Sequence, residues 1–172
     1  MMSLFLFLGL RALHVLLAAT WIGSTIFIST LLAPAVDASG PSGGQVMMNI
    51  NRRGITAYMG VLGGMTIITG VYLLWHFAGS FGSITASHAG IAFGIGGTSG
   101  ILAGIIGGSV VGRSGVKIAT LMREAASLPE GPAKAELIGR SVPLHHRIKT
   151  GTRAVIGLQL VALVLMAVGH YV

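Results

Sequence analysis

Four long apolar stretches divide this 172-residue chain, and they are its strongest constraint on folding. They cover approximately residues 4–36, 55–78, 88–111 and 148–172. Each is long enough to cross a membrane, because a helix needs about 20 apolar residues to span a hydrocarbon core of roughly 30 Å. Hydrophobic residues make up 53% of the chain and charged residues only 9%, too few for the surface of a water-soluble domain. The sequence therefore predicts an all-α, integral membrane four-helix bundle that forms a single domain over residues 1–172.

Basic residues predict how these helices are oriented, because lysine and arginine concentrate on the cytoplasmic side of spanning helices. Arg52 and Arg53 end the first connection, whereas residues 79–87 contain no charged residue. Seven more basic residues lie in or beside the connection between the third and fourth stretches: Arg113, Lys117, Arg123, Lys134, Arg140, Arg147 and Lys149. We therefore expect a multi-pass protein of the bacterial cytoplasmic membrane with both termini outside (N-out, C-out). The net charge of +7 suits an anionic lipid surface, and no basic motif with interleaved aromatic residues indicates a nucleic-acid partner.

The cytoplasmic segment of about residues 113–147 is predicted to be partly helical. Apolar residues with helical spacing follow the third stretch, namely Ile118, Leu121, Met122, Ala125 and Leu128. The third helix should therefore continue to Pro129, and Pro132 and Pro143 should bracket a second, short helix. Residues 37–44, rich in glycine, serine and proline, are predicted to form a turn on the same side.

Four of the six histidines fall near the outer face in this orientation. His76 ends the second stretch, His88 opens the third, His170 nearly ends the fourth, and His14 approaches their level if Arg11 sits at the interface. Ionisable groups in a membrane are costly and usually face a partner, a cavity or a cofactor. The pattern predicts a buried metal or haem site with ligands drawn from these four histidines. Alternatively, each of these histidines lies at the membrane interface and makes hydrogen bonds with water or lipid headgroups.

The first stretch presents one face with unusual chemistry. Arg11, His14, Ala18, Trp21 and Thr25 follow three- and four-residue steps and so share a helix face. Ala18 leaves room for a flat macrocycle beside His14, and Trp21 could pack on its edge. Arg11 could pair with haem propionates or extend to the interface, since the four acidic residues all lie outside the spans.

Two further stripes end at outer histidines. Tyr58, Met65, Tyr72 and His76 align on the second stretch, and Gln159, Leu163, Met166 and His170 align on the fourth. They indicate either ordinary packing with interfacial aromatic residues, or a site in which Tyr72 or Gln159 orients a ligand by hydrogen bonding.

Glycines recur every four residues along the third stretch, at Gly96, Gly100, Gly104, Gly108 and Gly112. Small residues at this spacing let helices approach closely in lipid. The Gly96–Gly112 ridge predicts close packing inside the domain, or contact with a second copy or a larger membrane complex.

The run Ala12-Leu13-His14 followed by Trp21-Ile22-Gly23 carries a family resemblance. It resembles the first helix of two related groups of small bacterial membrane proteins, the copper-resistance protein D (CopD) group and the HemJ type of protoporphyrinogen oxidase. Further similarity to the HemJ pattern lies in Arg52-Arg53, Thr69-Gly70, Leu73-Leu74, His88-Ala89, Arg113 and Lys117. The resemblance implies a four-helix membrane protein that binds haem b, with His14 matching the first-helix histidine and His88 a second one.

Two features depart from the HemJ pattern. HemJ-type proteins have an Asn-Glu pair upstream of a proline, where this chain reads Arg140-Ser141-Val142-Pro143. They also have a second histidine late in the third helix, where this chain has glycines. The resemblance therefore does not extend to protoporphyrinogen oxidase activity, and whether the protein is an enzyme stays open.

These observations lead to one main expectation and two alternatives. We expect one or two haem b groups, with His14 as an axial ligand and a second ligand from His88, His170 or His76, in electron transfer or small-molecule redox chemistry near the outer face. One haem and a copper ion would also suit four histidines, while the redox partner stays unknown. The alternatives are a copper- or zinc-handling membrane protein without haem and a non-catalytic subunit of a larger complex. The chain has no cysteine, so thiolate sites are excluded.

Overall fold

The computed structural model describes residues 4–78, 85, 87–169 and 171, and within these residues it contains helices and no strand. The elements in chain order are α1 (Leu4–Phe27), the π-helical turn η1 (Ile28–Leu32), α2 (Ala33–Ala38), α3 (Gly40–Arg52), α4 (Ile55–Ala78), α6 (His88–Ile106), the π-helical turn η2 (Gly107–Gly112), α7 (Arg113–Ala126) and α8 (Pro132–Val168). Four helical segments are long and apolar enough to cross a membrane: Leu4–Ala38, Ile55–His76, His88–Ala126 and Pro132–Val168. The all-α fold and four helices of spanning length are thus confirmed.

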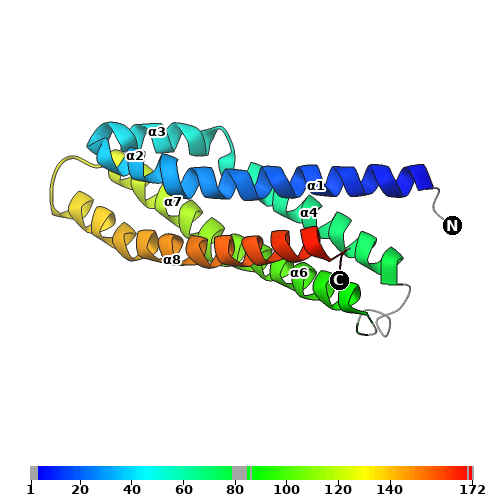
Figure 1. Ribbon diagram of the computed structural model, residues 1–172. Helices are drawn as coiled ribbons and strands as arrows, with labels where there is room; N and C mark the ends of the chain where they lie inside the picture. Colours follow the sequence, from blue (N-terminus) through cyan, green and yellow to red (C-terminus); the bar gives the residue numbers. More distant parts are fainter. Residues whose placement is uncertain (1–3, 79–84, 86, 170, 172) are drawn as a thin grey trace.

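The long helices pack against one another in an antiparallel order (Figure 1). α1 lies along α4, α4 along α6 and α6 along α8, while α1 also contacts α8. The start of α1, the end of α4, the start of α6 and the end of α8 therefore point toward one end of the molecule, and α2, α3 and α7 lie at the other. One residue from each long helix meets in a buried cluster of Trp21, Leu62, Ala103 and Val155, which we call the core layer.

The first helix is longer than predicted and contains a π turn before Pro34. Proline has no amide hydrogen, and its ring would collide with the carbonyl four residues earlier in a regular helix. The amide of Ala33 instead donates to the carbonyl of Ile28, five residues back. This wider turn lets the helix pass Pro34 and continue to Ala38.

The predicted turn within residues 37–44 does occur, at Ser39, but it is shorter than predicted because α3 begins at Gly40. Ser39 alone interrupts the helical backbone, and Gly40 has a φ of +56°, a conformation that glycine adopts without steric penalty. Pro41 then occupies the first turn of α3, where its missing amide hydrogen costs nothing. A side chain at Gly43 would overlap the carbonyl of Val36, so the glycine permits α3 to fold back on α2.

The predicted short helix between Pro132 and Pro143 is wrong, because α8 is one 37-residue helix that contains Pro143. Side chains on either side of this proline donate hydrogen bonds to carbonyls that precede it. The Ser141 hydroxyl donates to the Ile138 carbonyl at 2.7 Å, and His145 Nδ1 donates to the Ser141 carbonyl at 2.9 Å. The predicted extension of the third helix does occur, as α7, and it ends at Ala126, shortly before Pro129.

The glycine ridge of α6 makes contacts inside the molecule. A β-carbon added at Gly96 would lie 3.4 Å from Leu165 of α8, and one at Gly104 would lie 2.5 Å from Ile67 of α4. A four-residue repeat drifts around a helix with 3.6 residues per turn, so the two glycines face different neighbours. Gly108 has open space beside it. Contact with a second copy through the rest of the ridge stays a prediction.

Candidate functional site

The interface of α1 with α4 contains five of the seven predicted site residues. The Trp21 indole lies on Gly63, where an added β-carbon would be 3.0 Å from the ring. His14, seven residues before Trp21 on α1, contacts Thr69. Phe7 lies seven residues before His14, and the centroid of its ring is 5.5 Å from that of His76. We call this line of contacts the α1/α4 seam.

Arg11 and Tyr72 occupy the level between the last two contacts of this seam. Facing residues of the antiparallel pair are His14 with Thr69 and Phe7 with His76, so Arg11 stands opposite the turn of α4 that carries Tyr72. Arg11 is exposed, and Tyr72 is half exposed. The seam therefore places a cation, a phenol and two imidazoles in the amino-terminal half of α1 and the carboxyl-terminal half of α4.

Hydrogen bonds at His14 determine which ring nitrogen carries the proton. His14 Nδ1 lies 2.9 Å from Thr69 Oγ1. The Thr69 hydroxyl donates to its own helix, since Oγ1 lies 2.7 Å from the Met65 carbonyl and 3.1 Å from the Thr66 carbonyl. With its hydrogen used there, Thr69 accepts from His14 Nδ1–H. Nε2 of His14 then carries the lone pair and is the nitrogen able to bind a metal.

Gly70 fixes the position of the same ring. A β-carbon at Gly70 would lie only 2.8 Å from His14 Cε1, so the imidazole rests directly against the backbone of α4. Thr69 and Gly70 together hold the ring by a hydrogen bond on one atom and by contact on its edge. We had expected Tyr72 or Gln159 to orient a ligand histidine. The sequence did not single out Thr69 for this role, although Thr69-Gly70 is part of the HemJ-like pattern.

The predicted ligands that the structure describes, His14, His76 and His88, lie at two levels along the helices. His14 is seven residues from the core-layer residue Trp21, about 10 Å at a rise of ~1.5 Å per residue. His76 and His88 are 14 and 15 residues from the core-layer positions of α4 and α6, about 21 and 22 Å by the same rise, and both are exposed. His14 is therefore deeper than His76 and His88 and does not share their level. His170 lies outside the described residues.

The three predicted ligands that the structure describes, His14, His76 and His88, do not form a cluster. No three histidine, cysteine, aspartate or glutamate side chains of the described residues come together in a way that could hold a metal ion. Trp21 is buried in the core layer and packs on helices, so its indole contributes to the interior below His14. His145 and His146 are exposed on α8, far from the seam, as expected for surface residues.

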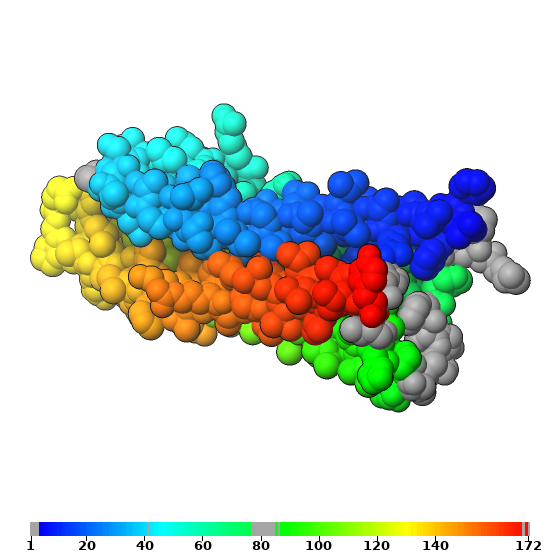
Figure 2. Space-filling view, in the orientation of Figure 1, coloured from blue at the N-terminus to red at the C-terminus, as the bar shows by residue number. Residues whose placement is uncertain are grey.

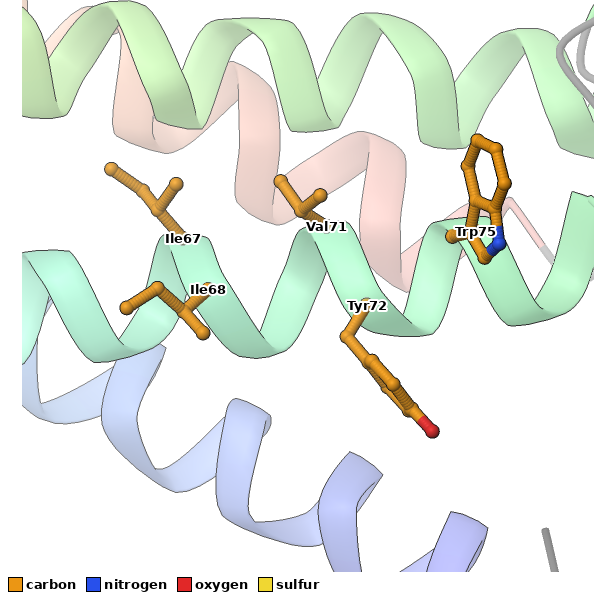
Figure 3. A pocket seen from close by; sticks show the side chains of 5 residues that line it. All are labelled: Ile67, Ile68, Val71, Tyr72 and Trp75. Carbon is orange, nitrogen blue, oxygen red and sulfur yellow. The ribbon is translucent and has the colours of Figure 1, made fainter.

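The amino-terminal half of α1 contains no buried residue. The buried residues of this helix are Trp21, Ile22 and Thr25, all in its second half. On the neighbouring surface of α4, an open apolar groove of about 450 Å³ is lined by Ile67, Ile68, Val71, Tyr72 and Trp75. Figure 3 shows Tyr72 pointing to the side on which α1 runs and Trp75 to the side of α6. The apolar surface around the seam is therefore open to lipid or to a flat apolar ligand.

Comparisons with protein-family models, with curated proteins and with solved structures find no match for this chain. The resemblance to the CopD and HemJ groups rests on the sequence motifs alone.

The hydrogen bonds at His14 predict a defined tautomer. In protein with ¹⁵N-labelled histidine, NMR should show one ring with a protonated Nδ1 and an unprotonated Nε2, and this signal should vanish in His14→Gln. Thr69→Val should remove the preference and lower the free energy of unfolding by about 1 kcal/mol, whereas Thr69→Ser should retain both. An unprotonated Nδ1 at His14 would contradict the assignment.

Proposed function

We propose that this chain is a haem b-binding integral membrane protein that serves electron transfer or small-molecule redox chemistry near the outer membrane face. His14 Nε2 is its axial ligand. The observation that supports this role is the Thr69 hydrogen bond to Nδ1, together with the contact of the ring on Gly70. Metal-binding histidines usually donate their other ring N–H to a second group, which fixes the tautomer and the ring orientation.

The ligand supply favours haem over a directly bound ion. Structural zinc sites need about four protein ligands and catalytic ones about three. Around His14 the described residues provide no such set, and the chain has no cysteine. Haem brings four nitrogens of its own, so one histidine is enough to hold its iron. Haem binding is therefore favoured over the alternative of a copper- or zinc-handling protein.

Other residues of the seam have roles that follow from their positions. Arg11 is three residues outward from His14 on α1, about 4.5 Å along the axis, which suits pairing with a propionate directed to the outer surface. Tyr72 offers a phenol hydroxyl at the same level. The apolar surface of α1 and α4 excludes water from the deeper edge, and Trp21 closes the interior below. Bound haem would supply one-electron chemistry between ferric and ferrous iron.

The two histidine levels restrict how ligands pair. His76 and His88 lie about 11 Å beyond His14 along the axis, too far to bind the opposite face of the same iron. They are therefore assigned to a second haem, or to a copper ion, at the outer level. No other histidine of the described residues lies at the level of His14, so a haem held there would leave room for a second ligand such as oxygen or nitric oxide.

We also propose an N-out, C-out four-helix bundle in the bacterial cytoplasmic membrane. The end of the molecule that holds α3 and α7 carries Arg52, Arg53, Arg113, Lys117 and Arg123, as the cytoplasmic side of a membrane protein does. These side chains are exposed and suit contact with anionic lipid headgroups.

Removal of His14 tests the haem assignment. Purified His14→Ala should lose its haem, and Thr69→Val should bind haem roughly 10–100-fold more weakly because the ligand is no longer oriented. His146→Ala, at an exposed histidine of α8, is the matched control and should retain a normal spectrum. Full haem content and an unchanged spectrum in His14→Ala would show that another residue binds the iron.

The absence of native cysteine allows a direct test of orientation. Tyr171→Cys and Ser127→Cys place single thiols at exposed positions near the two ends of the molecule. In spheroplasts, a membrane-impermeant maleimide should label Cys at 171 at once and Cys at 127 only after detergent is added. The reverse pattern would overturn the proposed topology.

A further inference from the structure

Gln159 is a buried polar side chain in the apolar half of α8. It is 1% exposed and is the largest fully buried side chain that the structure describes. It lies where α8 contacts α1. These two helices run side by side across one face of the molecule (Figure 2). Val155 of the core layer is one turn away on the same helix. Burial of an amide in such surroundings is costly unless its hydrogen bonds are made.

Only part of the hydrogen-bonding capacity of this amide is used. Gln159 Nε2 lies 3.4 Å from Thr25 Oγ1, a long contact. The Thr25 hydroxyl donates to the Trp21 carbonyl at 2.8 Å, so toward Gln159 it acts as an acceptor. Gln159 Oε1 has no hydrogen-bond donor among the described residues.

Rotation of the amide does not solve this problem. If Oε1 and Nε2 exchanged places, the oxygen would face a hydroxyl whose hydrogen is already used, and the two N–H groups would lose Thr25. One polar group of Gln159 is therefore unpaired in either orientation. An unmade hydrogen bond of a buried group costs roughly 1–3 kcal/mol.

The surroundings restrict what can supply the missing donor. The core layer one turn away is closed, since Trp21, Ala103 and Val155 have exposures of 6%, 0% and 4%. Ser99 of α6 is a further buried polar residue. It lies between Gly96, which contacts Ala162 of α8, and Ala103 of the core layer. This register places Ser99 at the level of Gln159. A water molecule needs two to four polar partners, and Gln159 and Ser99 provide them.

We infer that Gln159 Oε1 binds an internal water molecule in the middle of the membrane-spanning region, with Ser99 as its second partner. The site is separate from the proposed haem ligand, because Thr25 is 11 residues from His14 on α1, about 16 Å along the axis. The water gives α1, α6 and α8 a shared polar contact within an otherwise apolar interior.

Infrared spectroscopy of one labelled side chain tests this site. The chain contains two glutamines, so ¹³C labelling of the side-chain carbonyl in a Gln45→Asn background isolates Gln159. Gln45 is exposed on α3, and its band in the parent protein gives a reference for a hydrated amide. Spectra are recorded in H₂¹⁶O and H₂¹⁸O.

The expected result is a Gln159 carbonyl band at the frequency of a hydrogen-bonded amide, with a narrow water O–H band that shifts in H₂¹⁸O and is lost in Gln159→Met. A carbonyl band at the frequency of a free amide would overturn the proposal. So would a hydrogen-bonded carbonyl without a water band, because the donor would then belong to the protein, and Ser99→Ala would free it. The labelled Gln45→Asn protein decides between these results even if Gln159→Met fails to fold.

Discussion

Two ring side chains of α1 rest directly on glycines of α4, and the position of the candidate site depends on these contacts. Trp21 lies on Gly63 and His14 lies on Gly70, two helical turns apart. Association of helices in lipid gains little from the hydrophobic effect, so close packing and interhelical hydrogen bonds hold them together. Any larger residue at Gly63 or Gly70 would push α1 away. The glycine contacts that join the two helices therefore also hold the imidazole of His14 beside Thr69.

Polar residues in the spanning helices fall into two groups. Hydroxyls such as those of Thr66 and Ser29 donate to carbonyls of their own helix and link nothing else. His14 and Gln159, in contrast, contact polar atoms on another helix. Gln159 Oε1 is buried without a hydrogen-bond partner among the described residues, and an apolar interior makes such an atom costly.

The length and apolar character of the helices could be predicted from the sequence, since those properties are local. The turn at Ser39 could also be predicted, but the α2–α3 hairpin could not, because it depends on the contact of Gly43 with Val36. Pro143 misled the prediction, since α8 continues through it and the side chains of Ser141 and His145 bond to carbonyls that precede it. His14 could be predicted as a candidate ligand. Its partner Thr69 could not, since that pairing depends on the register of α1 against α4.

Haem binding through His14 should be visible in the absorbance spectrum of the purified protein. Oxidised and dithionite-reduced samples, with a pyridine haemochrome assay and metal analysis on the same material, should show a Soret band and reduced α and β bands of haem b. A protein that is colourless as purified and stays colourless after reconstitution with haemin would show that the seam does not hold haem.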